Sequence, residues 1–483
     1  MSSHSLPVCR AALAAVAMLT LLGACAVGPD FKRPAVALPA AYPAQSENTS
    51  AAQHALAADW WTLYRDTQLD ELVKATLQNN TDLDRVLAQI EEAEAVLDET
   101  GAGLFPEVQL GASSTRSRSS TLNAQRLPAG TPAISNSHRL ALSASFEVDF
   151  WGKLKRATET ARAQVWGTRY ARDVTALTLA GTTAQAYFNL RALDAQIAVT
   201  QATLTSREDT VAVMTKRAEG GLASDLELNQ TQGARADAAL QLRELQRQRA
   251  LVEHQLGTLT GSLDLRIAPG DLAQLAIPAP PAAGLPSTLL ERRPDIYLAE
   301  QQLIAANAQI GMAKAAQFPT FSLLGSFGGQ SEEFGNLLKA GARIWSIGLD
   351  ATMPIIDAGR YAARTRQAEA RHRQSLADYR KSVETAFQEV ADALSNVEQT
   401  RTAVADQQVK VDVSRNALRL SQLRYQAGYS GYLEVLDAQR TANAAELALL
   451  QNRQAQLIYS VDLMKALGGG WSPAAAAPVA RRE

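Results

Sequence analysis

Apolar residues along this chain follow two different periods, and each period occurs twice. In the proline-free segment between Gly152 and Pro269, apolar residues recur every seven positions, at Leu190, Ile197, Leu204, Val211 and Ala218. This spacing is typical of a coiled-coil seam. It predicts a helix over 152–218, about 100 Å long at 1.5 Å per residue, followed by a return helix over 225–259.

A period of two marks the segments between these helices. Leu140, Leu142, Ala144, Phe146 and Val148 alternate with small or polar residues. Alternation with one polar face predicts strands, and there are four such segments: 107–117, 139–150, 320–330 and 344–354. Each is about ten residues long, which is enough to cross a bilayer when the strand is tilted.

Four strands cannot close into a membrane barrel by themselves, because the smallest closed barrels have about eight. An open sheet in lipid would leave the hydrogen bonds of its edges unmade. Either several chains contribute strands to one barrel, or the strands form a soluble sheet. Three chains with four strands each would close a barrel of about twelve strands.

The second half of the chain repeats the first. Leu226-Glu227-Leu228 matches Leu433-Glu434-Val435 at an offset of 207 (433 − 226), and Phe105-Pro106 matches Phe318-Pro319 at an offset of 213 (319 − 106). The six-residue difference falls in the loop between two strands, where a surface position tolerates insertion. The pattern predicts an internally duplicated α+β fold with a first repeat over 67–261, a linker over 262–287, a second repeat over 288–468 and a tail over 469–483.

Each long helix is predicted to reverse at glycines. The first reversal, over 219–224, contains Gly220 and Gly221, and the second, over 428–431, begins and ends at Gly428 and Gly431. Glycine accepts the positive φ that helix C-caps often require. Carboxylates follow both reversals.

The remaining helices complete the two repeats. A helix over 68–103 is predicted before the first strand, and helices over 358–427 and 432–467 flank the second reversal. The heptads of the second repeat carry polar residues such as Gln408 and Arg415. Helices of this kind suit a curved wall with water on one side, although a solid bundle with polar defects is the alternative.

The N-terminus has the features of a secretory signal over 1–24. Arg10 precedes the apolar run Ala11–Leu22, which is too short to span a bilayer. Leu22-Gly-Ala-Cys25 resembles the bacterial lipobox, which implies that Cys25 carries S-diacylglycerol and an N-palmitoyl chain. The alternative is an ordinary signal peptide with an incidental cysteine. Residues 25–66 are rich in proline and are predicted to form a lipid-anchored tether.

Charge and motifs argue against nucleic-acid binding and against enzyme activity. The net charge of −2 provides no basic field for nucleic acid. None of the five histidines lies in a metal-binding spacing such as HExxH, and neither a P-loop nor a nucleophile elbow is present. We therefore expect no enzyme activity, no metal and no cofactor beyond the N-terminal lipid.

Several segments together carry a family resemblance. They are Cys25-Ala-Val-Gly-Pro-Asp-Phe-Lys-Arg-Pro34, Arg424-Tyr425, Leu433-Glu-Val-Leu-Asp-Ala-Gln439 and Leu467-Gly-Gly-Gly-Trp471. With the lipobox and the duplication, they resemble the TolC/OprM-type outer-membrane efflux channels of Gram-negative bacteria, in the lipoprotein branch that serves resistance-nodulation-division (RND) pumps. The resemblance covers nearly the whole mature chain.

This resemblance implies a homotrimer with a twelve-stranded barrel in outer-membrane lipid, a long periplasmic α-helical barrel and an equatorial belt. Such a channel is the passive exit duct for an inner-membrane RND-type pump and a periplasmic adaptor (membrane fusion protein). The glycine turns would lie at the periplasmic tip, where the adaptor makes contact. The alternative function is a periplasmic coiled-coil adaptor or scaffold lipoprotein without a pore, in which four amphipathic strands are not expected.

The resemblance also assigns gate residues at that tip. Tyr425 matches a tyrosine of the closed-state links, Leu433 an apolar constriction and Asp437 an acidic ring. Glu434 falls at a second ring position, and Glu227 falls opposite the gate tyrosine. Ser430 and Gln426 stand where relatives have gate arginines, so salt bridges are expected to contribute less here.

Electrostatics and water exclusion give a physical basis for the roles of Asp437 and Leu433. Three copies would turn Asp437 into a ring of carboxylates that attracts cations, and a ring of Leu433 would exclude water at a narrow point. The alternative is that Glu434 and Asp437 only stabilise a helix N-terminus, where acids favour the helix dipole.

Overall fold

The computed structural model describes residues 26–42, 56–120, 132–281 and 286–473. The predicted signal peptide and Cys25 lie outside these residues. The chain divides into two compact units. Unit 1 comprises residues 1–34, 89–168 and 299–379, and unit 2 comprises 35–88, 169–298 and 380–483.

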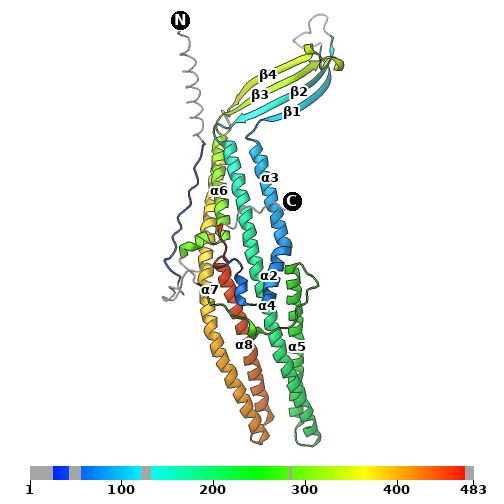
Figure 1. The fold of residues 1–483 in the computed structure, drawn as a ribbon, viewed down its shortest axis with the longest axis vertical. Helices are drawn as coiled ribbons and strands as arrows, with labels where there is room; N and C mark the ends of the chain where they lie inside the picture. The colour runs from blue at the N-terminus through cyan, green and yellow to red at the C-terminus, as the bar shows by residue number, and fades with distance from the viewer. Residues whose placement is uncertain (1–25, 43–55, 121–131, 282–285, 474–483) are drawn as a thin grey trace. The chain divides into compact units, whose positions relative to one another are not determined.

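Unit 1 contains one antiparallel sheet of four strands in the order β1-β2-β3-β4 (Figure 1). The strands are β1 (Glu107–Arg118), β2 (Ile134–Val148), β3 (Thr320–Ser331) and β4 (Arg343–Thr352). Their register places Leu110, Leu142, Phe327 and Trp345 in one row across the sheet. The predicted alternation therefore produces one continuous apolar face.

β1 and β3 end one residue later than expected, and β2 and β4 differ by more. β2 ends at Val148, before the predicted 150, because Asp149 accepts a hydrogen bond from the backbone N–H of Lys155 and Gly152 adopts a φ of 72° in the turn into the next helix. β4 ends before Pro354, which has no N–H to donate. β2 begins at Ile134 rather than 139, since the polar residues 134–138 also pair with β1 although they carry no apolar alternation.

The seven helices in the described part of the chain include two long pairs. They are α2 (Thr67–Asn79), α3 (Thr81–Ala102), α4 (Lys153–Glu219), α5 (Asp225–Thr260), α6 (Pro294–Ala315), α7 (Arg360–Gln426) and α8 (Tyr432–Ala466). α4 and α5 form one hairpin and α7 and α8 the other (Figure 1). None of the described helices combines the length and the hydropathy needed to cross a bilayer.

The prediction of one helix over 68–103 is wrong. The chain leaves the helical conformation at Asn80, whose ψ is 127°, and starts α3 at Thr81. The Asn80 side chain accepts a hydrogen bond from the Asp82 N–H and donates one to the Leu259 carbonyl. An asparagine that serves both elements in this way competes with helix continuation.

The largest buried cluster lies in unit 2, where α2, α4, α5 and α8 meet the 3-10 helix η2 (Trp60–Tyr64). Tyr64 and Phe188 are fully buried there, with ring centroids 4.8 Å apart. The Tyr64 hydroxyl lies 2.7 Å from that of Ser460, so its polar end is satisfied within the core. Residues 60–64 thus pack against the helices.

The helix ends show the duplication at the level of single hydrogen bonds. At the end of α4, the Leu222 N–H bonds the Arg217 carbonyl at 2.7 Å, and at the end of α7 the Tyr429 N–H bonds the Arg424 carbonyl at 2.9 Å. Both bonds span five residues, both sit beside a glycine with positive φ, and they lie 207 residues apart (429 − 222). This is the Schellman arrangement, and its repetition confirms an internally duplicated fold.

Candidate functional site at the helix tips

The tips of the two helix hairpins in unit 2 share a small apolar cluster. Its buried members come from α4, α5 and α8, and partly buried residues of α7 pack against it: Met214, Ala234, Tyr432, Val435, Leu436, Leu418 and Tyr425. The cluster therefore ties the reversal of the second repeat to that of the first.

Tyr425 lies at the centre of these contacts. Its ring packs edge-on against Tyr432 with centroids 5.5 Å apart, and its hydroxyl points to the Met214 sulfur at 3.8 Å. The guanidinium of Arg217, at the end of α4, lies 5.3 Å from the Tyr425 ring centroid. A cation over an aromatic face is attracted by the ring quadrupole. Tyr425 thus joins α7 to α4 and α8.

Glu434 has a partner that sequence reasoning did not assign. The Arg424 Nε lies 3.5 Å from the Glu434 Oε1, so an ion pair crosses the second reversal. Both side chains are about half-exposed, and an exposed pair of this kind contributes at most about 1 kcal/mol. Ser430, at the position where a relative has an arginine, has a buried hydroxyl without a hydrogen-bond partner among the described residues.

Glu227 makes a different set of contacts. Its carboxylate accepts a hydrogen bond from the Ser224 N–H at 2.9 Å, and its own N–H bonds the Ser224 hydroxyl at 3.2 Å. These reciprocal bonds form a capping box at the start of α5. In the second repeat the corresponding cap is Gly431 (431 − 224 = 207), which has no side chain to close such a box.

α8 presents two of the predicted gate residues on its exposed side. Leu433 is 59% exposed and Asp437 is also exposed, whereas Tyr432, Val435 and Leu436 are buried. Residues four apart share one face of a helix. Leu433 and Asp437 therefore point away from the apolar cluster of their own chain.

The four predicted turn glycines divide into two conformations. Gly221 and Gly428 have φ of 71° and 77°, in the left-handed region that favours glycine. Gly431 has φ −74° and ψ 162°, which any residue adopts, and Gly220 is not among the positive-φ glycines. Each reversal thus contains one position, Gly221 or Gly428, whose backbone conformation favours glycine.

Burial alters the titration of two groups near this site. Burial raises the pKa of the Tyr432 hydroxyl. Arg207 of α4 is 8% exposed, and its burial lowers the pKa of its guanidinium. Arg440 of α8 lowers it further, so two cations act on each other across the α4–α8 contact. Neither Arg207 nor Arg440 was singled out from the sequence.

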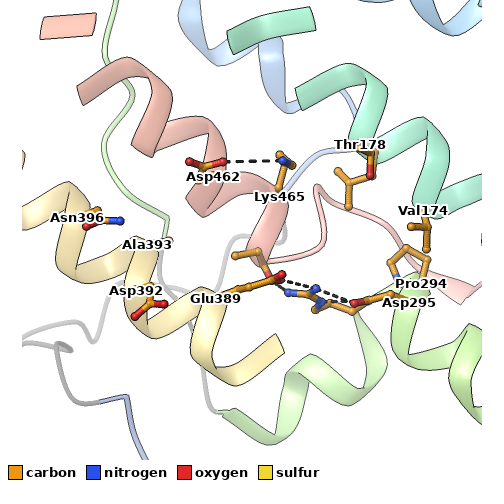
Figure 2. A pocket seen from close by; sticks show the side chains of 13 residues that line it. Val174, Thr178, Pro294, Asp295, Glu389, Asp392, Ala393, Asn396, Asp462 and Lys465 are labelled. Carbon is orange, nitrogen blue, oxygen red and sulfur yellow. Dashed lines mark hydrogen bonds and ion pairs between the residues drawn. The ribbon is translucent and has the colours of Figure 1, made fainter. Parts of the chain in front are cut away.

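A second polar region in unit 2 lies where α6 begins (Figure 2). Buried Arg293 pairs with Asp295 at 2.7 Å and Glu389 at 2.6 Å and donates to the Ala466 carbonyl at 3.1 Å. It borders a cavity of about 440 Å³ lined by α4, α6, α7 and α8. These contacts join the start of α6 to α7 and α8. Within the described ranges, no group of three or more His, Cys, Asp or Glu side chains is placed to hold a metal ion.

The whole chain, rather than the tips alone, matches known proteins. Residues 72–262 and 285–469 match the model of the outer membrane efflux protein family. The chain belongs to this family. It is 34% identical over 473 residues to the outer membrane protein OprJ of Pseudomonas aeruginosa, covering 95% of this chain and 96% of that one. It is 33% identical over 459 residues to the cation efflux system protein CusC of Escherichia coli, covering 94% and 97%.

Solved structures agree with the sequence relatives. The open state of the MtrE outer membrane channel of Neisseria gonorrhoeae superposes with a TM-score of 0.81 at 30% identity, over 92% of this chain and 98% of that one. The two matched segments coincide with the two repeats. The protein is thus an efflux protein of the outer membrane, and the predicted fold class and function class are confirmed.

Proposed function

We propose that three copies of this chain form one channel, the outer-membrane exit duct of a tripartite efflux system. The observation that carries this proposal is the sheet of unit 1, which has an apolar face and two open edges. β1 and β4 each pair with only one described strand. Open edges are not stable in lipid, so further strands must pair with them.

Copies of the same chain are the natural source of those strands. An antiparallel contact between β1 of one copy and β4 of the next would close the edges, and three copies would give about twelve strands. The helices of the three copies would form a periplasmic wall. The pump would then be an inner-membrane RND-type transporter, joined through a periplasmic adaptor that contacts the tips at Gly220, Gly221, Gly428 and Gly431.

The proposed gate is formed by the exposed side of α8. Leu433 and Asp437 are exposed and lie outside the apolar cluster of their own chain, which leaves them available to meet their copies around a threefold axis. Tyr425 would hold the second hairpin against the first until the adaptor engages, and the Arg424–Glu434 pair would stabilise the second reversal itself. Glu227 would act indirectly, by fixing the start of α5 through Ser224.

The gate proposal predicts a change in conductance. Leu433→Gly removes an apolar ring that excludes water, so single-channel conductance in a planar bilayer should rise. Asp437→Ala removes a carboxylate from each copy, so cation selectivity in the same measurement should fall. The duplication offers matched controls at the equivalent positions of the first repeat, Leu226→Gly and Gln230→Ala, and these should conduct as the unmodified protein does.

The outcome separates the channel from a scaffold without a pore. Unchanged conductance and selectivity in both gate variants would refute the gate assignment while leaving the channel intact. A protein that stays monomeric without detergent and gives no conductance would instead support the adaptor or scaffold alternative.

A further inference from the structure

The apolar face of the sheet ends in basic residues at the end of the strands far from the helices. Along β1 this face carries Val108, Leu110 and Ala112, then Ser114, and finally Arg116 and Arg118. The register puts Ser114 beside His138 of β2, and Arg343 of β4 lies in the row of Ala112 and Leu140. We call Arg116, Arg118, His138 and Arg343 the basic rim.

The three arginines of the basic rim are exposed and unpaired. No ion pair or hydrogen bond joins them to another residue that the structure describes. By contrast, several arginines of the helices pair with a carboxylate, among them Arg156, Arg249 and Arg415. His138 is held in place by the Ser114 hydroxyl, 2.9 Å from its Nδ1, and by the Phe334 ring, edge-on at 5.8 Å.

The acidic side chains of the strands lie away from the basic rim. Glu107, Glu147 and Asp350 lie on the opposite face and at the helix end of the sheet. Beyond β3, Glu332 and Glu333 occupy the connection to β4, where the Glu333 carboxylate accepts from the Asn336 amide. The basic rim and the three acidic side chains of the strands thus lie on opposite faces and at opposite ends of the sheet.

From His138 outward, the basic rim lies at the height where lipid headgroups would begin, and Arg343 lies two residues closer to the apolar band. From Val148 to His138 the β2 strand rises ten residues (148 − 138), or about 34 Å at 3.4 Å per residue. A tilt of about 40° reduces this to about 25 Å, the height of the apolar band of outer-membrane barrels. Arg116 and Arg118 continue past that height, and exposed Phe334 sits there as interfacial aromatics do.

We propose that the basic rim binds the phosphate groups of a phosphorylated glycolipid in the outer leaflet. This inference rests on the proposed barrel, whose apolar face would be turned to lipid. Arginine recognises phosphate through two parallel N–H···O bonds, and basic clusters beside a lipid-facing surface bind anionic headgroups. The shared apolar face places the acyl chains on Leu110, Leu142 and Trp345 while the headgroup meets the arginines.

The test compares phosphorylated with dephosphorylated lipid A on the purified protein in neutral detergent. Binding of a fluorescent diphosphoryl lipid A would be measured for the unmodified protein and for the triple variant Arg116→Gln, Arg118→Gln, Arg343→Gln. We expect the triple variant to bind roughly tenfold more weakly or worse, and dephosphorylated lipid A to bind poorly to both. Arg139→Gln, at the same end but on the opposite face, is the matched control and should bind as the unmodified protein does.

Four outcomes overturn the inference, and the first three are equal affinity in the triple variant, an equal loss in Arg139→Gln, and no preference for the phosphorylated lipid. Full competition by inorganic phosphate at equal concentration also overturns it, because it would show a site for free anions. Heat-resistant oligomers and single-channel conductance would be recorded for every variant. A protein that forms conducting trimers but shows no phosphate selectivity fails only this inference, whereas absence of trimers and conductance fails the channel proposal.

Discussion

Glu227 and Glu434 occupy the same position of the two repeats (434 − 227 = 207) but hold different partners. Glu227 bonds back to Ser224 within its own cap, whereas Glu434 pairs with Arg424 across the reversal. The difference arises one turn earlier, where the first repeat has Ser224 and the second has Gly431. A glycine cap leaves the carboxylate at the third helical position free to pair elsewhere.

Gly431→Ser should convert the second cap into a copy of the first. The backbone at Gly431 has negative φ, and an added Cβ meets nothing within 4 Å, so serine fits. We expect a capping box with Glu434 and a gain of a few tenths of a kcal/mol, up to about 1, for the first turn of α8. Hydrogen exchange of the amides over 432–436 should slow, and channel openings should become rarer.

Gly431→Ala is the control for this substitution, because it adds the Cβ without the hydroxyl. It should not slow amide exchange in α8. If serine and alanine act alike, backbone entropy explains the effect and the capping box does not.

Residue-scale contacts at the tips could be read from the sequence only in part. The glycine reversals were predictable because positive φ at a helix end favours one residue type. The Arg424–Glu434 pair was not, since its partners are ten residues apart (434 − 424) and meet only through the path of the turn. By contrast, the Ser224–Glu227 contact has a local signal, because a serine followed three residues later by a glutamate is the spacing of a capping box.

At the scale of elements, α3 and α6 begin at equivalent positions of the two repeats. Thr81 and Pro294 are 213 residues apart (294 − 81), and so are Ala102 and Ala315 at the other ends. Pro294 marks a helix start plainly, because proline favours the first helical position and cannot continue a preceding helix. Asn80-Thr81 is a weaker signal of a helix start, and the apolar stripe continues through these two residues. Hydrophobic periodicity therefore predicts one helix where the structure has α2 and α3.

Thr81→Pro should therefore be tolerated and should raise stability slightly. Asn80 already has the extended conformation required before proline, Thr81 is exposed, and its N–H makes no backbone bond among those between elements. Proline at a compatible site stabilises by about 0.4–1 kcal/mol. Thermal melting followed by circular dichroism in detergent should show an unchanged or higher midpoint.

Gln89→Pro in the interior of α3 is the contrasting variant. It should cost about 3 kcal/mol or more and lower the melting midpoint. If Thr81→Pro lowers the midpoint as far, then Asn80 is not a helix boundary in solution and the two-helix description of 67–102 is wrong.

On the scale of the whole molecule, two features would hold the N-terminal segment in place. One is the proposed lipid on Cys25. The other is a set of contacts within unit 1. The Val27 N–H bonds the Trp151 carbonyl at 3.0 Å, Asp30 pairs with Arg156 at 2.7 Å, and Arg33 makes two hydrogen bonds to Glu300.

Close backbone packing adds to these polar contacts. Gly28 lies so close to Gly311 that a Cβ added at Gly28 would be 2.5 Å from the Gly311 Cα. The segment is thus held by the protein itself, whatever the lipid contributes.

Because these contacts do not depend on the lipid, loss of lipidation should leave trimer assembly intact. Cys25→Ala, expressed behind an ordinary cleavable signal peptide, should lose palmitate labelling but keep heat-resistant trimers, because the contacts of Val27, Asp30 and Arg33 remain. The double variant Asp30→Ala, Arg33→Ala should keep the label and lose heat resistance instead, since Arg156 and Glu300 are then left partly buried without those partners. Absence of palmitate on the unmodified protein would remove the lipoprotein assignment. Loss of trimers in Cys25→Ala alone would show that the lipid, and not the docked segment, holds this end of the chain in place.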